Sequence, residues 1–163
     1  MNMKLKQVYL VSLLLFSYTF CQSQKINFKI SNLASGIKSV EITSGNIILL
    51  LDENENISSV NSLIGGTFDY WSDGFGVLSG KIRSIGNINI DYWSGGSGVL
   101  SGNIKSFGDI SIDYWSDGFG ILSGKVRSIG NISIDYWPDG FGVLSGKIRS
   151  IIGNSSGMFV TIE

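Results

Sequence analysis

The amino-acid sequence predicts an all-β fold, in which tandem 22-residue β-hairpin repeats form an antiparallel meander sheet. Three observations support this prediction. The words DYWS or DYWP recur every 22 residues, apolar β-formers alternate with polar residues in each unit, and the turn signals IGN and DGF interrupt each unit. The central copies are nearly identical and the flanking copies degenerate, which is typical of a capped array.

The alternation also predicts which side chains face the core. Three-residue loops at both turns leave two strands of eight residues in each unit and place Lys81 opposite Asp91. Because adjacent strand residues point to opposite faces, Tyr92 is expected in the core and Trp93 on the charged face. The residues expected beside Tyr92 are Leu78, Ile82, Ile88 and Ile90.

A parallel β-solenoid is the alternative fold, because one coil can also hold 22 residues. The phrase SGNIKSFGDISI resembles the coils of secreted parallel β-helix adhesins. Equivalent residues of a solenoid stack about 4.8 Å apart, which would align Asp69 with its copies as a column of like charges. An antiparallel meander doubles that spacing, and the sequence therefore favours the meander.

The regions before and after the repeats are assigned by their composition. Residues 1–23 have a basic start and a short apolar run, which together are typical of a signal peptide. The remaining 24–163 are expected to form a single β-repeat domain. Its expected parts are irregular N-terminal strands and a cap at 24–68, which begin the same sheet and fold over its apolar face, four repeats at 69–153, and a closing strand at 154–163.

The signal peptide predicts a bacterial protein that is secreted or held in the cell envelope, in the periplasm or on the outer surface. The apolar run is too short to favour a membrane span, so none is expected in the mature chain. Cys21 is the only cysteine, and its lipidation would make the chain a lipoprotein. Tyr18, Thr19 and Phe20 before it do not fit a lipidation motif, which favours cleavage after Ser23.

The composition argues against catalysis and against nucleic-acid binding. The chain contains no histidine, so a Ser/His/Asp triad cannot form. It contains 12 basic and 13 acidic residues, which gives no positive field for nucleic acid. The aspartates of the DG pairs are interpreted as turn formers, and residues 52–56 as a solvated loop rather than a calcium loop. The sequence therefore predicts no enzyme, no cofactor and no metal site.

The aromatic and glycine spacing resembles that of a known repeat family. Tyr70, Trp71, Gly74, Gly80 and their copies resemble the MORN repeat, which implies a β-hairpin unit, although KIRSIGNINI has no counterpart there. The phrase GKIRSIGN is similar to the GKIKSIGN-type tandem repeats of exported bacterial proteins of uncharacterised role. Neither resemblance implies a site.

Two functions are compatible with this pattern. The first is a surface or extracellular binding or adhesion module that presents a Trp-lined sheet face to a glycan or another extracellular polymer. The second is a structural protein of the cell envelope that self-associates through its sheet edges. The tryptophans could instead pack on one another and stiffen the sheet. The candidate ligand-binding residues are Trp71, Trp93, Trp115 and Trp137.

Overall fold

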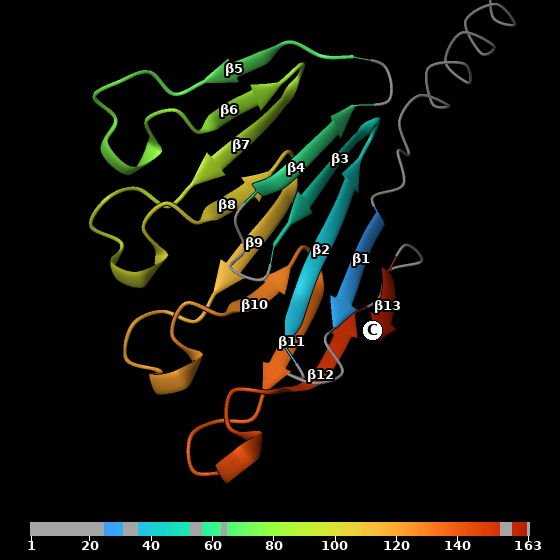
Figure 1. Ribbon diagram of the computed structural model, residues 1–163, viewed down its shortest axis with the longest axis vertical. Helices are drawn as coiled ribbons and strands as arrows, with labels where there is room; N and C mark the ends of the chain where they lie inside the picture. Colours follow the sequence, from blue (N-terminus) through green and yellow to red (C-terminus); the bar gives the residue numbers. More distant parts are fainter. Residues whose placement is uncertain (1–24, 31–35, 53–56, 63–64, 154–157, 163) are drawn as a thin grey trace, which may run out of the picture.

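The computed structural model describes residues 25–30, 36–52, 57–62, 65–153 and 158–162. In these ranges the chain is all-β, with thirteen strands in two sheets and four short 3₁₀ helices. Figure 1 shows the smaller sheet lying across the larger one, while four loops project from the strand ends on one side of the larger sheet. The predicted signal peptide and Cys21 lie outside the described residues and stay predictions.

The larger sheet is an eight-stranded meander in which the strands follow one another in chain order. Every neighbouring pair is antiparallel, as the repeat predicts, and the parallel solenoid is therefore excluded. Its strands are β5 (Phe68–Tyr70), β6 (Ile82–Ile85), β7 (Ile88–Tyr92), β8 (Ile104–Phe107), β9 (Ile110–Tyr114), β10 (Val126–Ile129), β11 (Ile132–Tyr136) and β12 (Ile148–Gly153).

The smaller sheet has five strands in the order β13-β1-β2-β3-β4. The last strand of the chain pairs in parallel with the first, whereas the other pairs are antiparallel. The prediction that the N-terminal region starts the same sheet as the repeats is therefore wrong. The strands are β1 (Lys25–Ile30), β2 (Ile37–Ser44), β3 (Ile47–Leu51), β4 (Ile57–Ser62) and β13 (Met158–Ile162).

The core lies between the two sheets. In β3, burial alternates so that Ile47, Leu49 and Leu51 point inward. These residues belong to one buried cluster with isoleucines and tyrosines of the repeat strands, including Ile112 and Tyr114. The expectation that the N-terminal region covers the apolar face of the repeats is thus confirmed. A sheet with one apolar face needs such a second layer to remove that face from water.

The hairpin turns differ from the predicted three-residue loops. Ser84 pairs with Asn89 and Ile85 with Ile88, so the turn contains two residues, Gly86 and Asn87. Gly86 has φ of 59°, a left-handed conformation that glycine adopts without strain and that two-residue hairpins require. The predicted register is therefore wrong by one residue, and Ile85 is a fully buried strand residue instead of a turn residue.

A β-bulge explains how the isoleucines of β6 share a face. Ile82 and Ile85 are three residues apart, so a regular strand would point them to opposite sides. The pairing with β5 shifts register within this strand, which brings both side chains to the core side while Arg83 points outward. The predicted Lys81–Asp91 pairing is consequently wrong, because Lys81 lies over the Tyr92 ring and Asp91 accepts a hydrogen bond from Ser106. The ion pair beside this strand is that of Arg83 with Asp69.

The second connection of each unit is longer than the predicted DGF loop. After β5, the backbone of Trp71 makes the last ladder hydrogen bonds, with Lys81 and Gly80, at 2.9 Å each. The residues between these partners form a projecting loop with one turn of 3₁₀ helix. The helices are η1 (Gly76–Leu78), η2 (Gly98–Leu100), η3 (Gly120–Leu122) and η4 (Gly142–Leu144). The strands are accordingly shorter than the eight residues predicted.

The tyrosines of the DYW words face the core, as predicted, except at the edge of the sheet. Tyr114 and Tyr136 are buried and Tyr92 is half-buried, whereas Tyr70 of the edge strand β5 is exposed. The Tyr114 hydroxyl donates to the Ile104 carbonyl at 2.9 Å, and Tyr92 donates to Ile82 in the same way. Each of these hydroxyl groups therefore ties one repeat to the unit before it.

Candidate functional site

The outer face of the eight-stranded sheet carries the side chains that point away from the five-stranded sheet. In β9, Asp113 lies on this face, while Ile112 and Tyr114 on either side are buried in the core. Trp115 follows Tyr114 and ends the same row before the loop begins. Strand alternation therefore separates the two aromatic residues of each DYW word, as predicted.

Each tryptophan of this row is partly buried by its own loop. The ring centroids of Trp115 and Phe119 are 4.9 Å apart, and Trp115 also packs against the core. The equivalent pairs are Trp71 with Phe75 at 4.9 Å and Trp137 with Phe141 at 5.0 Å. The buried indole N–H groups of Trp71, Trp93 and Trp115 have no acceptor in the described part of the chain. Because they are buried, these N–H groups are not accessible from the surface.

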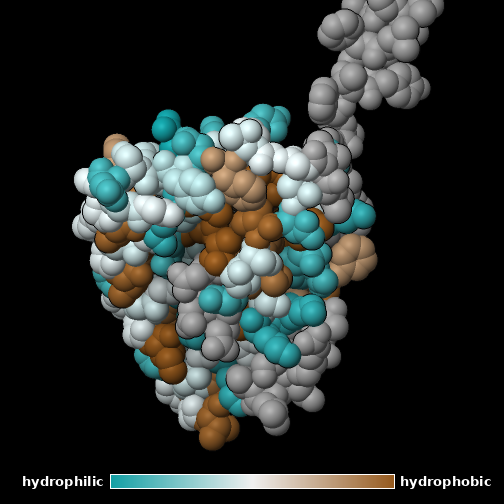
Figure 2. Space-filling view, turned by 45° about the horizontal axis from the view of Figure 1, so that its top comes forward, coloured by the Kyte–Doolittle hydropathy of each residue, from teal (hydrophilic) through white to brown (hydrophobic). Residues whose placement is uncertain are grey.

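The phenylalanines are the more exposed partners. Phe75, Phe119 and Phe141 are 52%, 51% and 49% exposed. The second unit has Ser97 at this position, so the aromatic pair occurs in three of the four units. Figure 2 shows apolar residues recurring down the edge of the molecule where the loops lie. The sequence predicts only a turn at the DGF motif, but its recurring phenylalanine is also a signal of an exposed aromatic row.

A cation lies over the ring of each of the four indoles. The Arg127 guanidinium lies 5.0 Å from the Trp115 ring centroid and 4.0 Å from the Asp113 carboxylate. Arg83 and Arg149 repeat both contacts, and Lys105 lies 5.1 Å from Trp93. The side chains of these ion pairs are about half exposed, so each pair contributes at most about 1 kcal/mol to stability. The three pairs also neutralise the charges of these arginines and aspartates on the outer face.

Polar side chains form the floor beside the aromatic rows. The Ser106 hydroxyl donates to the Asp91 carboxylate at 3.2 Å, and Ser128 pairs with Asp113 and Ser133 across neighbouring strands. A hollow of about 400 Å³ lies on this floor between β9 and β12, with Trp115 among its lining residues. The outer face therefore combines hydroxyl and carboxylate groups with aromatic rings.

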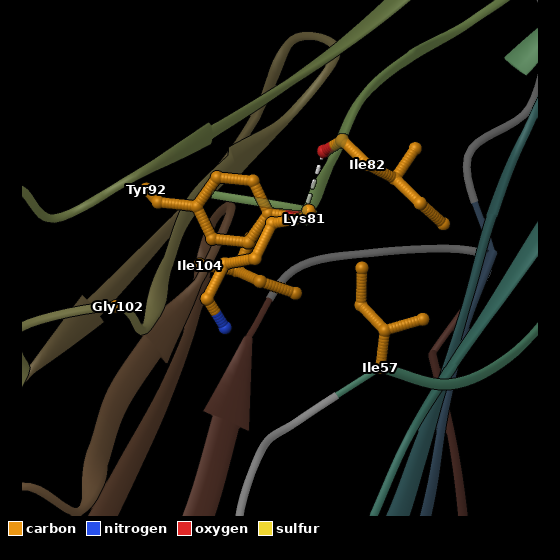
Figure 3. Close-up of a pocket in the computed structure, with 7 residues that line it drawn as sticks. Ile57, Lys81, Ile82, Tyr92, Gly102 and Ile104 are labelled. Carbon is orange, nitrogen blue, oxygen red and sulfur yellow. Dashed lines mark hydrogen bonds between the residues drawn. The ribbon is translucent and has the colours of Figure 1, made fainter. Parts of the chain in front are cut away.

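A second hollow of about 230 Å³ lies between the sheets, near the start of β4 (Figure 3). Ile57, Ile82 and Ile104 provide its apolar lining, and the Lys81 Nζ lies 5.4 Å from the Tyr92 ring centroid. The Tyr92 hydroxyl donates to the Ile82 carbonyl at 2.8 Å. Burial raises the pKa of Tyr92 to about 12, which keeps the phenol neutral. Its hydroxyl therefore acts as a structural hydrogen-bond donor.

The aspartates of the loops connect neighbouring units. The Asp139 carboxylate accepts a hydrogen bond from the Ile121 N–H at 3.3 Å. Asp117 lies so close to Gly98 that a side chain there would collide with the carboxylate. Among the described residues, no group of three or more His, Cys, Asp or Glu side chains is placed to hold a metal ion.

No family model matches the chain, and no curated protein and no solved structure is significantly similar to it. In the part of the chain that the structure describes, no helix has the length and apolar character that a membrane crossing requires.

Proposed function

We propose that this chain is an exported, non-catalytic binding module that holds an extended, uncharged polysaccharide on the outer face of its eight-stranded sheet. The observation that carries the proposal is the row of half-exposed phenylalanines, each resting on a tryptophan beside a polar floor. Aromatic rings supply flat apolar surface for sugar rings, and hydroxyl and carboxylate groups bind sugar hydroxyls.

The spacing of the units supports a polymeric ligand. Two strands separate equivalent residues of successive units, which places them roughly 10 Å apart. This step is close to the length of two hexose units in an extended chain. One polymer could therefore meet Phe75, Phe119 and Phe141 at the same point of its own repeat, and each additional ring would increase the affinity.

The charge pattern supports an uncharged ligand. Arg83, Arg127 and Arg149 each face one carboxylate and one indole, so these three arginines are already neutralised and offer little attraction to an acidic polymer. The whole chain has a formal net charge of −1. Long-range attraction of a polyanion is therefore not expected.

The test is binding of purified protein to a panel of soluble neutral polysaccharides (β-glucan, xylan, mannan and dextran), with alginate as the acidic comparison. We expect at least one neutral polymer to bind and to change the tryptophan fluorescence. A Phe75→Ala, Phe119→Ala, Phe141→Ala triple variant should bind it more than tenfold more weakly, because each ring contributes about 1 kcal/mol. Trp115→Ala should also weaken binding, since Phe119 loses its support.

The second unit provides the matched control. Ser97 and Phe75 have similar backbone angles, φ of −84° and −89°, so Ser97→Phe should add the missing ring and tighten binding a few-fold. Ser97→Ala should leave binding unchanged. The proposal is wrong if no neutral polymer binds, or if the triple variant binds as tightly as the wild type.

A further inference from the structure

Successive loops of the array pack on one another through the same small contact. A Cβ placed on Gly102 would lie 3.9 Å from the Cβ of Val77, in the loop of the preceding unit. Gly124 meets Val99 in the same way at 3.8 Å, and Gly146 meets Ile121 at 3.0 Å. The apolar residue of each loop is thus covered by the glycine that follows the loop of the next unit.

Two kinds of polar contact also cross boundaries between successive units. Asp139 accepts a hydrogen bond from the Ile121 N–H of the preceding unit. The Tyr92 and Tyr114 hydroxyls donate to carbonyls of the preceding strands β6 and β8. We call the surface that the preceding unit contributes its tail side; it offers an apolar residue, a backbone N–H and a backbone carbonyl. The surface of the following unit is its head side, which offers a glycine, a carboxylate and a phenol.

The last unit ends on an uncovered tail side. Val143 is 84% exposed, whereas Val77, Val99 and Ile121 are 44%, 48% and 45% exposed. Leu144 is 41% exposed, although its equivalents in the second and third units are 7% exposed. Strand β12 is also an edge of the sheet, so its outer backbone groups face no strand.

The first unit begins with an uncovered head side. Strand β5 is the opposite edge of the sheet, and its Tyr70 is 53% exposed. Asp73 and Gly80 hold the positions that Asp139 and Gly146 hold in the last unit. In the described structure, a Cβ on Gly80 would have open space around it. The two ends of the array are thus the separated halves of the boundary that the chain contains internally.

We infer that a second copy of this chain docks head to tail, with β5 of one copy beside β12 of the other, so that the array continues across the junction. In this arrangement the first unit of one copy follows the fourth unit of the other, just as each unit follows the one before it within the chain. This register places Gly80 on Val143, the Asp73 carboxylate at the Val143 N–H, and the Tyr70 hydroxyl at the Ile148 carbonyl. The docking uses the sheet edges and is independent of what the outer face binds.

Because the head differs from the tail, each docked copy leaves one free head and one free tail. Such a heterologous contact does not close on itself unless the series bends into a ring. The expected product is therefore an open series whose length grows with protein concentration, with the outer faces aligned along it.

The test is sedimentation velocity of the purified chain over a hundredfold range of concentration. We expect the wild type to form reversible species larger than dimers. Val143→Lys, which blocks the tail, and Asp73→Lys, which blocks the head, should each abolish association. Their equimolar mixture should form a dimer and nothing larger, since it retains one free tail and one free head. Asp73→Ala should weaken association by at least tenfold, because it removes the acceptor for the Val143 N–H.

Matched variants separate association from folding. Val160→Lys adds the same charge at an exposed valine of the five-stranded sheet and should leave association unchanged. Asp139→Ala removes the equivalent internal contact, so it should lower the melting temperature without weakening association. The inference is overturned if the wild type is monomeric at the highest concentration, if Val143→Lys and Asp73→Lys associate like the wild type, or if their mixture stays monomeric.

Discussion

The two faces of the eight-stranded sheet are built from the same 22-residue words, yet they differ in almost every physical property. The inner face carries isoleucines and tyrosines in a closed apolar cluster. The outer face carries serines, ion pairs and aromatic pairs that remain at least partly exposed. One step along a strand separates the two, so each DYW motif directs its Tyr to the inner face and its Asp and Trp to the outer face.

The five-stranded sheet makes this division possible. A single-layer meander would leave its isoleucine face in water, but the non-repetitive strands β1 to β4 and β13 cover it. The outer face therefore contributes less buried apolar surface to the fold than the inner face does. Substitutions should therefore affect stability strongly on the inner face and weakly on the outer face, and the predictions below test this contrast.

The largest expected effect is on the inner face. Phe107 is fully buried, and Phe107→Ala should reduce the free energy of unfolding by about 3–5 kcal/mol through lost burial and a new cavity. Phe119→Ala makes the same change on the outer side, where it should cost only about 1 kcal/mol because the ring is half exposed. Chemical denaturation measures both values. Equal losses would contradict the division between the two faces.

A smaller effect is expected from the hydroxyl of a buried tyrosine. Tyr114→Phe removes the donor that satisfies the Ile104 carbonyl and should destabilise the fold by about 1–2 kcal/mol. Tyr70→Phe is the matched control, because Tyr70 is exposed on the edge strand and its loss should lie within error. Thermal unfolding of the two variants gives the comparison, and an equal shift in both would show that Tyr114 has no special role.

The smallest effect concerns pH. Burial raises the pKa of Tyr92 from 10.0 to about 12, so the folded chain holds this proton more tightly than the unfolded chain. The stabilisation is fully present below pH 10 and is lost as the pH rises toward about 12. Tyr92→Phe should make the unfolding free energy fall less steeply across that range. A curve as steep as the wild-type curve would indicate that other groups cause the loss.

The fold class was predictable from the sequence because the repeat determines it. A 22-residue period with strand-like alternation leaves few architectures, and charge stacking disfavoured the solenoid. The placement of Tyr and Trp on opposite faces followed from strand geometry alone. It is independent of the turn length, because adjacent residues of one strand always alternate.

The register was not predictable in the same way. The IGN word permits a two- or three-residue turn, and the choice depends on whether Ile85 pairs with Ile88. Bulges at Arg83 and Lys105 break strict alternation, so the sequence pattern does not reveal that Ile85 and Phe107 point inward. The sheet to which the N-terminal strands belong was equally hidden, because isoleucine-rich strands can either extend a sheet or cover it.

The candidate site was predicted only in part. The sequence identified the tryptophan row but not its partners, because burial by Phe119 and coverage by Arg127 arise from the loop and the bulge. The phenylalanine of DGF was not predicted as part of the site, because the adjoining Asp-Gly pair already accounts for the motif as a turn. A recurring aromatic residue beside a turn is a signal worth reading, since turns seldom require a large apolar side chain.

The most direct test of the division between the two faces is hydroxyl-radical footprinting of the purified protein, read residue by residue with mass spectrometry. The account predicts rapid modification of Phe75, Phe119 and Phe141 and slow modification of the buried Phe107, Tyr114 and Tyr136. Modification of Tyr114 and Tyr136 as fast as that of the exposed Tyr70 would contradict it, because the tyrosine row would then not lie beneath the five-stranded sheet.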